Sequence, residues 1–176
     1  MKIGVISHTR TLATEQDLPA QARLALADVD LVLHTGNVGE LTFLKSLQDR
    51  FGLTFAVYGQ QDSDEAKRFL EADKVVEFAN RRIGMVFATP DLDTTRRLPG
   101  FKRQSPTNEA LAEALSAYFA NIDCVLFGHP TKPLNYIHQG ILIFNPGPII
   151  TPHGTPGSMG ILQITDRAMT GRIVLL

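Results

Sequence analysis

Short apolar runs that each end in a polar cluster are the feature that most restricts the fold of this chain. Residues 2–7, 31–35 and 53–58 are such runs, and amphipathic segments follow them at 18–29, 40–51 and 63–70. Runs of this length bounded by polar residues are typical of buried strands, and apolar residues three or four apart are typical of helices. The first 70 residues therefore predict three strand–helix units and the start of a parallel sheet.

The pattern changes after residue 70. Further strands are expected at 75–79, 83–88, 124–127, 134–138, 141–144, 158–165 and 172–176. A turn at 80–82 is expected to join the first two into a hairpin, and Ser105 and Pro106 offer an N-cap and a first-turn proline for a helix. Strand–helix units followed by hairpins predict an α/β fold with two packed mixed β-sheets flanked by helices, formed by residues 1–176 as a single domain.

Composition excludes several classes of function. The 17 Lys and Arg residues are balanced by 18 Asp and Glu residues, so no overall field attracts nucleic acid or an acidic membrane. No apolar run approaches the ~20 residues of a membrane helix, and the N-terminal residues lack the pattern of a secretion signal. The single cysteine, Cys124, lies in an apolar run and is expected to be a buried thiol, which favours a reducing cytoplasm.

Polar clusters directly follow five of the expected strands. In open α/β sheets, ligands bind at the carboxyl ends of strands, so these clusters are expected to converge on one site. The clusters are Ser7-His8-Thr9-Arg10, His34-Thr35-Gly36-Asn37, Gly59-Gln60-Gln61-Asp62, Thr89-Pro90-Asp91 and Gly128-His129-Pro130-Thr131.

Four of these clusters, together with a fifth motif near residue 145, resemble those of a known family. The motifs are Ile6-Ser7-x-Thr9, His34-Thr35-Gly36-x-Val38, Val57-Tyr58-Gly59-x-x-Asp62, Phe127-Gly128-His129-x-x-Lys132-Pro133 and Phe144-Asn145-Pro146-Gly147. In order and spacing, from residue 2 to about residue 160, they resemble the calcineurin-like metallophosphoesterases. The resemblance is closest to the short phosphodiesterase branch, which includes the small scaffold subunit of the retromer coat. It implies an αββα sandwich.

The resemblance also implies a catalytic centre that this sequence lacks. Related enzymes hold two metal ions about 3.5 to 4 Å apart, bridged by an Asp, and use a metal-bound water to attack phosphate. By resemblance, the seven ligand positions are His8, Arg10, Asn37, Gln60, Pro90, His129 and Thr131. Of these, only His129 is the family's residue. Six such changes at about tenfold each amount to roughly a millionfold, or roughly 8 kcal/mol, so a two-metal hydrolase is not expected.

Two histidines of this vestigial site are the remaining metal candidates. His8 and His129 have imidazoles suited to a single Zn, Cu or Ni ion, with Asn37 and water completing the site. Alternatively, they form a pair of neutral, hydrogen-bonded histidines in a closed pocket. No cofactor is expected; the alternative is a divalent Mn, Ni or Zn ion.

The guanidinium of Arg10 suggests a different ligand. Loss of two acids and gain of a permanent cation turn a cation site into an electropositive cleft that holds an anion without metal. Alternatively, Arg10 extends into solvent or pairs with Asp91 or Asp93. The anion-binding residues expected are Arg10, Asn37, His129 and Asn145, with main-chain N–H groups after Gly128 and Asn145.

Other polar residues receive structural interpretations. His34 is expected to be structural and not catalytic, Ser63 or Asp62 to cap a helix, His153 to be exposed and His138 to lie on a sheet surface. A basic loop contains Arg96, Arg97, Lys102 and Arg103. It is either a contact for an acidic partner or a solvated loop, and no RNA-binding signature accompanies it.

The sequence therefore predicts a divergent family member that is catalytically inactive and acts as a binding or scaffold module, with anion binding as one form of that role. The alternative is a phosphodiester hydrolase with weak or unusual metal dependence, so whether the chain is an enzyme stays open. Its partner is expected to be another protein or a phosphorylated small molecule, with homo-oligomers possible and no membrane contact.

Overall fold

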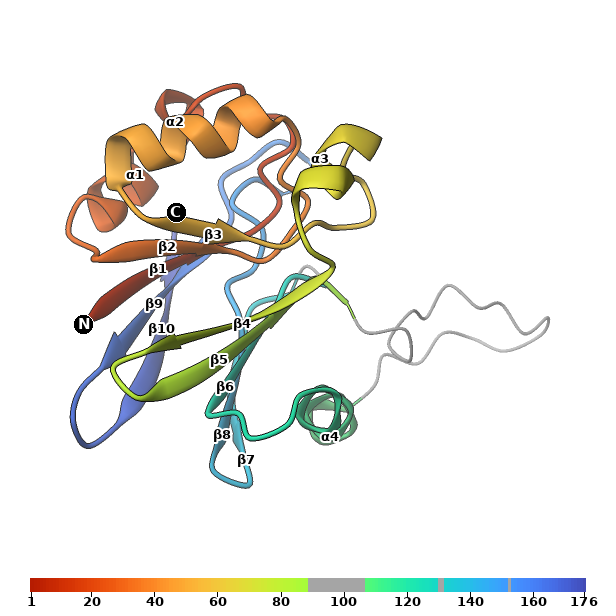
Figure 1. Ribbon diagram of the computed structural model, residues 1–176. Coiled ribbons are helices and arrows are strands. Elements are labelled where there is room, and N and C mark those ends of the chain that lie inside the picture. Colours follow the sequence, from red (N-terminus) through yellow and green to blue (C-terminus); the bar gives the residue numbers. More distant parts are fainter. Residues whose placement is uncertain (89–106, 130–131, 152) are drawn as a thin grey trace.

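The computed structural model of the protein describes residues 1–88, 107–129, 132–151 and 153–176. In this part of the chain, ten strands form two five-stranded mixed sheets that pack face to face (Figure 1). The first sheet has the order β10-β9-β1-β2-β3, with bounds Met169–Leu175, Ser158–Ile164, Lys2–Ile6, Leu31–His34 and Thr54–Ala56. The second has the order β4-β5-β6-β8-β7, with bounds Asp73–Phe78, Arg81–Val86, Cys124–Phe127, Ile141–Asn145 and Leu134–His138.

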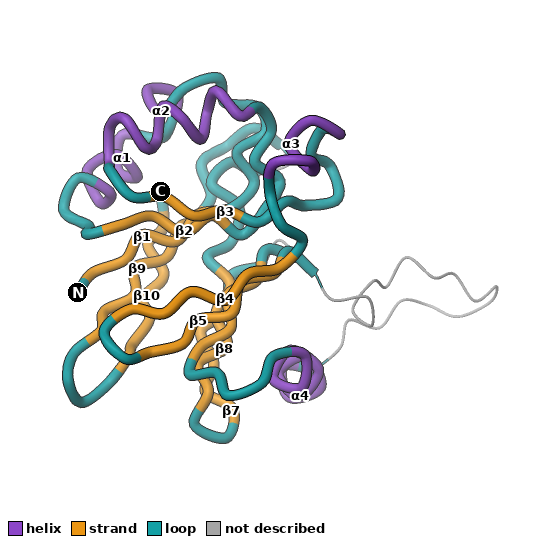
Figure 2. Tube along the Cα trace, in the orientation of Figure 1, coloured by secondary structure: helices purple, strands orange, loops and turns teal. Residues whose placement is uncertain are grey.

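Helices cover the outer faces of both sheets, as Figure 2 shows. The helices α1 (Ala20–Leu26) and α2 (Leu41–Phe51), with the short 3-10 helix η1 (Glu15–Asp17), lie against the first sheet, and α4 (Asn108–Tyr118) lies against the second. The helix α3 (Asp64–Phe69) follows β3. The architecture is therefore the predicted αββα sandwich.

Three apolar clusters hold these layers together. The central cluster lies between the sheets and contains Ile3, Val5, Leu33, Met85 and Phe144, each without solvent exposure. A second cluster joins the first sheet to α1 and α2, and a third joins the second sheet to α4. Since β1, β2 and β6 are apolar on both faces, they are buried from both sides, as the continuous apolar runs predict.

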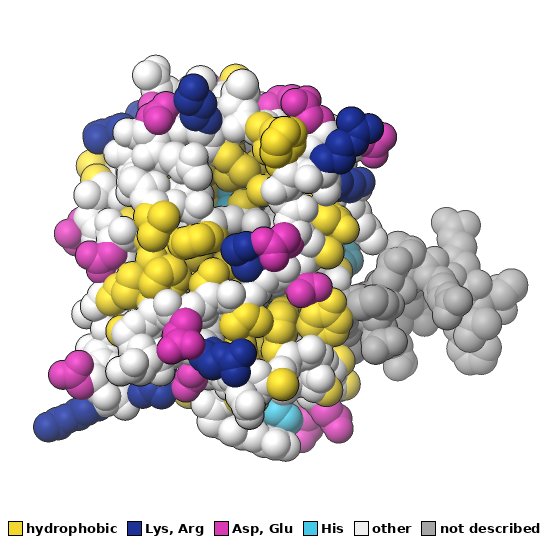
Figure 3. Space-filling model, in the orientation of Figure 1, with side chains coloured by type: hydrophobic (Ala, Val, Ile, Leu, Met, Phe, Trp, Pro, Cys, Tyr) yellow, Lys and Arg dark blue, Asp and Glu magenta, His cyan; other side chains and the backbone are white. Residues whose placement is uncertain are grey.

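One edge of the sandwich is closed by aromatic side chains. Phe55 of β3 and Phe78 of β4 pack with ring centroids 5.9 Å apart, which joins the two sheet edges. Figure 3 shows hydrophobic side chains along this side of the molecule, and acidic and basic side chains interspersed around them. This mixture agrees with the near-zero net charge of the chain.

The directions of the strands bring the loops that follow them to one edge of the sandwich. The strands β1, β2 and β3 are mutually parallel, and so are β5, β6 and β8. The hairpins β4–β5, β7–β8 and β9–β10 are antiparallel, so both sheets are mixed as predicted. Because parallel strands end at a common edge, the loops after all six parallel strands are able to meet.

Several predicted boundaries are corrected. The β4–β5 turn lies at Ala79 and Asn80, both with positive φ, and not at residues 80–82. The reason is that a tight hairpin needs two left-handed residues, a conformation that Asn tolerates well. The helix α4 is capped by Thr107, whose hydroxyl accepts from the Ala110 N–H, so the predicted cap at Ser105 is wrong. Ser105 and Pro106 themselves lie outside the described residues.

The predicted helix at 18–29 is shorter in the structure. Pro19 is its N-cap and it ends at Leu26, while Asp28 and Asp30 bind Lys2 at the start of β1.

Cys124 is fully buried as predicted, and burial raises the pKa of its thiol well above the ordinary range. Among the described residues, no helix is both long enough and apolar enough to cross a membrane.

Candidate functional site

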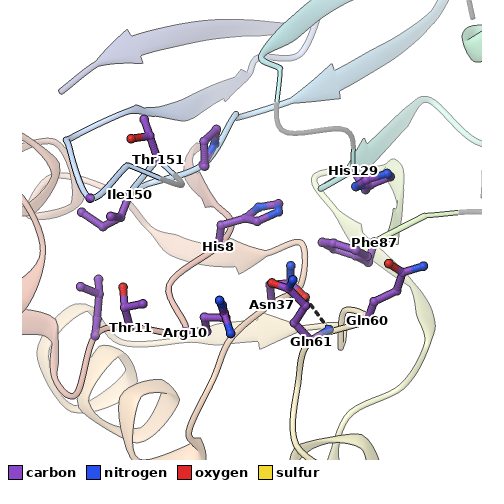
Figure 4. A pocket seen from close by; sticks show the side chains of 13 residues that line it. His8, Arg10, Thr11, Asn37, Gln60, Gln61, Phe87, His129, Ile150 and Thr151 are labelled. Carbon is purple, nitrogen blue, oxygen red and sulfur yellow. Dashed lines mark hydrogen bonds between the residues drawn. The ribbon is translucent and has the colours of Figure 1, made fainter. Parts of the chain in front are cut away.

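A cavity of about 630 Å³ lies where the loops after the parallel strands meet. Its lining comes from the loops after β1, β2, β3, β5, β6 and β8, so the predicted convergence of strand-end clusters is found. The lining residues are His8, Arg10, Thr11, Leu12, Asn37, Gln60, Gln61, Phe87, His129, Pro148, Ile150, Thr151 and Gly154. Figure 4 shows how their side chains surround one space.

Five predicted site residues line this cavity together. They are His8, Arg10, Asn37, Gln60 and His129. Pro90, Thr131 and the residues Asp91, Asp93, Arg96, Arg97, Lys102 and Arg103 lie outside the described residues. Neither the predicted ion pairs of Arg10 nor the predicted basic loop is therefore described by the structure. His153 is exposed and His138 half-buried on the edge strand β7, as predicted.

Asn37 is held in a fixed orientation at the floor of the cavity. Its Oδ1 accepts a hydrogen bond of 3.0 Å from the main-chain N–H of Gln61, and its side chain is almost fully buried. A main-chain N–H is always a donor, so the atom that faces it must be the amide oxygen. The amide Nδ2 is then the group that Asn37 offers to the cavity. This group donates hydrogen bonds and cannot bind a metal.

His8 is a mainly neutral imidazole at physiological pH. Burial, with additional effects of His129 and Arg10, lowers its pKa to about 4. Its Nδ1 lies 2.7 Å from the Ser7 hydroxyl and forms a hydrogen bond with it. Nε2 is therefore the nitrogen that remains for a ligand. The structure therefore supports the predicted neutral state of His8, and its second nitrogen provides one imidazole ligand at most.

The backbone is left-handed at both His8 (φ 59°) and Asn37 (φ 55°). The two loops bind each other there, because the His8 N–H donates to the Gly36 carbonyl and the Thr9 N–H donates to the Asn37 carbonyl. Left-handed residues other than glycine store backbone strain and are common at functional sites. The surrounding fold therefore holds His8 and Asn37 in a backbone conformation that these residues do not favour on their own.

Phe87 is a site residue that the sequence did not reveal, because it ends the apolar run of β5 and looks like core. Its ring lies 5.4 Å from the His8 ring and 5.7 Å from the His129 ring, between centroids. A Cβ added at Gly36 or Gly128 would come within 2.6 and 2.8 Å of Phe87 Cδ2. Those glycines are therefore needed to leave room for the ring. Both imidazole rings lie beside it in tilted orientations.

Of the two residues predicted to cap α3, Asp62 is not the cap. Ser63 is the N-cap, with its hydroxyl accepting from the Ala66 N–H. The Asp62 carboxylate instead accepts 2.7 Å hydrogen bonds from the main-chain N–H groups of both Gly39 and Gly59. This nearly buried carboxylate is therefore used to join the loops after β2 and β3, and it does not line the cavity.

His34 is structural, as predicted. It is fully buried, the Gly36 N–H donates to its Nδ1, and its Nε2 lies 2.8 Å from Thr9 Oγ1. The Thr9 hydroxyl donates to the Val38 carbonyl, so Nε2 carries the proton of a neutral ring. Burial, with a smaller effect of His8, lowers the pKa of His34 to about 3.

Asn145 was predicted to contact an anion in the cavity, but it does not line the cavity. Asn145 is buried, and its Oδ1 accepts from the Gly147 N–H. The Gly128 and His129 N–H groups both donate to the Phe87 carbonyl. Asn145 is not among the residues that line the cavity, and these main-chain donors are already hydrogen-bonded, so neither Asn145 nor these amides is retained as an anion contact. Of the predicted anion contacts, Arg10, Asn37 and His129 line the cavity.

The described lining of the cavity does not suit two bridged divalent ions. Among the described residues that line it there is no carboxylate, and no group of three or more His, Cys, Asp or Glu side chains in that part of the chain is placed to hold a metal. Bridged divalent ions need anionic oxygen or several imidazole ligands. Arg10 is a permanent cation at the same site and repels them.

The fold and the strand-end motifs agree with the results of comparison with known proteins. The family model described as the calcineurin-like phosphoesterase superfamily domain matches residues 1–167. The chain belongs to this superfamily.

Known relatives of this phosphoesterase-family chain differ in what their names describe. A probable metallophosphoesterase of Methanocaldococcus jannaschii, MJ0623, is 26% identical over 167 residues, which cover 95% of this chain and 78% of that protein. The crystal structure of Vps29 from Chaetomium thermophilum has a TM-score of 0.72 and 17% identity, covering 98% of this chain and 87% of that one. An archaeal phosphodiesterase has a TM-score of 0.65 and 18% identity, covering 99% and 100%. The two structural matches support the fold.

Proposed function

We propose that this chain is a non-catalytic member of the calcineurin-like phosphoesterase superfamily that acts as a binding or scaffold module in the cytoplasm. Its vestigial metal site takes an oxyanion in place of metal ions. The observation that carries the proposal is the orientation of Asn37, since this residue stands where the resemblance expects the bridging Asp.

The polarity of the site supports this proposal. A bridging carboxylate presents negative oxygen to the cavity, whereas the Asn37 amide presents Nδ2 because its Oδ1 is held by Gln61. Arg10 lines the same cavity and is exposed to solvent, and its guanidinium has five N–H donors. Hydrogen bonds from charged donors to anions are roughly twice as strong as neutral ones. The donors Arg10 and Asn37 thus complement an anion.

The scaffold role is supported by resemblance. The Vps29 structures from Chaetomium thermophilum and from Cryptosporidium parvum, the latter named Vacuolar Protein Sorting 29, share this fold. By analogy, the chain would present a surface to another protein, and its pocket would accept an anionic group of that partner or of a phosphorylated small molecule. Self-association is a further form of this role.

The alternative function is a phosphodiester hydrolase with weak or unusual metal dependence. It is favoured by one observation, the presence of the His8 and His129 imidazoles in one cavity. Zn or Ni accepts such ligands, and an archaeal phosphodiesterase shares the fold. Two imidazoles are a small ligand set for this chemistry, so the first proposal is preferred.

Two measurements decide between these functions. Metal content and calorimetry with Mn, Zn and Ni are expected to give less than one equivalent of bound metal and no saturable binding tighter than micromolar. An assay with bis(p-nitrophenyl) phosphate and each metal is expected to give no turnover. Stoichiometric metal together with turnover would establish the enzyme.

Anion binding is tested by thermal unfolding with inorganic phosphate or sulfate. Each anion is expected to raise the Tm of the native chain and of Arg172→Ala, a control that removes an exposed arginine on β10. The Arg10→Ala variant is expected to show no such rise. Equal stabilisation of the native chain and Arg10→Ala would remove Arg10 from the site.

A further inference from the structure

The cavity has an apolar side that anion binding by Arg10 does not explain. Leu12, Pro148 and Ile150 line it, and Leu12 and Ile150 belong to the apolar cluster between the first sheet and its helices. Figure 4 shows Ile150 on the opposite side of His8 from Phe87 and His129. The cationic group of Arg10 therefore shares the cavity with an aliphatic surface.

The charge of the described lining matches a single negative charge. Among the described lining residues, Arg10 is the one permanent cation, and no carboxylate is present. A carboxylate carries one negative charge, whereas inorganic phosphate carries between one and two at this pH. The excess charge of phosphate would find no second Arg or Lys among the described residues that line the cavity.

The donor geometry also suits a carboxylate. A guanidinium presents two parallel N–H groups that fit the two oxygens of one carboxylate. The Asn37 Nδ2 supplies a further neutral donor from the cavity floor. An aliphatic chain attached to this carboxylate would then find Leu12, Pro148 and Ile150 in the same cavity.

We propose that the ligand of this pocket is a singly charged organic carboxylate with a short apolar tail. Arg10 and Asn37 hold the carboxylate, and the tail lies on Leu12, Pro148 and Ile150. This proposal rests on the proposed anion-binding function and specifies its ligand class. A cavity of about 630 Å³ falls within the range of sites for small organic molecules.

The test uses the full chain and four probes, which are hexanoate, acetate, hexanol and inorganic phosphate. Calorimetry is expected to show hexanoate binding at least tenfold more tightly than acetate, because the four additional CH₂ groups gain apolar contact. Hexanoate is also expected to bind more tightly than phosphate and hexanol.

Two variants with matched controls locate the two halves of the ligand. Arg10→Ala is expected to weaken hexanoate and acetate at least tenfold, while Arg172→Ala does not. Ile150→Ser is expected to bring hexanoate affinity close to that of acetate and to leave acetate unchanged. Its control, Ile137→Ser, changes an exposed isoleucine on β7 and is expected to have no effect.

A measurement on the native chain covers the case in which Ile150→Ser does not fold. In methyl NMR spectra, hexanoate is expected to shift the Leu12 and Ile150 signals, and acetate to shift them far less. Equal shifts with the two anions, or shifts in neither residue, would overturn the placement of the tail.

The outcomes distinguish a wrong ligand class from the absence of an anion site. If phosphate binds through Arg10 and hexanoate binds no more tightly than acetate or phosphate, the carboxylate inference is wrong while the anion site stands. If hexanol binds as tightly as hexanoate, the pocket recognises only the tail and the inference is also wrong. If no anion binding depends on Arg10, the anion site itself fails.

Discussion

The main-chain N–H of Gln61 donates a hydrogen bond of 3.0 Å to the Oδ1 of Asn37. This bond links the loop after β3 to the loop after β2 and fixes the amide of Asn37 so that Nδ2 is offered to the cavity. A carboxylate at residue 37 would accept the same bond with one oxygen and place a second oxygen where Nδ2 now lies. A near-isosteric substitution can therefore reverse the polarity of the cavity floor.

The variant Asn37→Asp tests this relationship. It should lose the phosphate-induced rise in Tm, because a negative oxygen replaces a donor, and it should bind Mn or Zn more tightly than the native chain. Asn121→Asp is the matched control, since Asn121 is also left-handed (φ 53°) but is exposed and outside the cavity. Thermal shift measurements with phosphate and calorimetry with metal check both effects. An unchanged phosphate response in Asn37→Asp would contradict the assigned orientation of the amide.

Asp62 should contribute to stability by joining two loops. Its carboxylate accepts from the N–H groups of Gly39 and Gly59, and Asp62→Asn places an amide NH₂ against one of these donors. The free energy of unfolding in urea should fall by about 1–3 kcal/mol, the usual cost of an unsatisfied buried polar group. Asp49→Asn, at an exposed position on α2, should change it by less than about 0.5 kcal/mol. Equal effects of the two substitutions would refute this role of Asp62.

His34 should make the fold less stable at mildly acidic pH. Its folded pKa of about 3 lies below the ordinary value of 6.5, so the unfolded chain binds a proton between these values and the folded chain does not. Stability is therefore retained above pH 6.5 and lost as the pH falls towards 3. Between pH 7.5 and 5, this histidine accounts for a loss of about 2 kcal/mol in the free energy of unfolding.

Urea unfolding of His34→Gln at these two pH values checks the expectation. The variant should be less stable overall, but its stability should differ less between the two pH values than that of the native chain. Part of the dependence should remain, because the lowered pKa of His8 acts in the same direction. The surface variant His138→Gln should behave like the native chain. If His34→Gln kept the full native difference, the buried neutral state of His34 would be excluded as its cause.

Rebuilding the family's ligands should restore part of the metal chemistry. The variant combines His8→Asp, Arg10→His, Asn37→Asp, Gln60→Asn, Pro90→His and Thr131→His, and keeps His129. It should take up Mn and cleave an activated phosphodiester, which the native chain should not do. Full activity is not expected, because supporting residues alone account for 10- to 100-fold effects. The Phe87 ring, which contacts both histidines, is a further obstacle.

Circular dichroism separates the outcomes of this experiment. A rebuilt chain that folds and binds no metal would show that the assigned ligand positions are wrong, even though the superfamily is established. Of the six substituted positions, His8, Arg10, Asn37 and Gln60 are already known to line one cavity.

The sequence by itself predicted the architecture. Strands and helices depend on local spacing of apolar residues, and the runs at 124–127 and 134–138 coincide with β6 and β7. The prediction that polar clusters converge needed only the rule that parallel strands end at one edge. Element ends were less certain, because caps such as Thr107 and turns such as Ala79-Asn80 depend on individual hydrogen bonds and left-handed residues.

The tertiary structure alone decided the polarity of the site. Asn37 and Gln61 are 24 residues apart and Asp62 and Gly39 are 23 apart, so no local pattern shows that their side chains and amides meet. The same holds for Phe87, which looks like a core residue until its ring is found against His8 and His129. The sequence determined which polar groups stand at the strand ends, and the packing of distant loops determined which of their atoms face the cavity, because hydrogen-bond direction depends on partners that only the fold brings together.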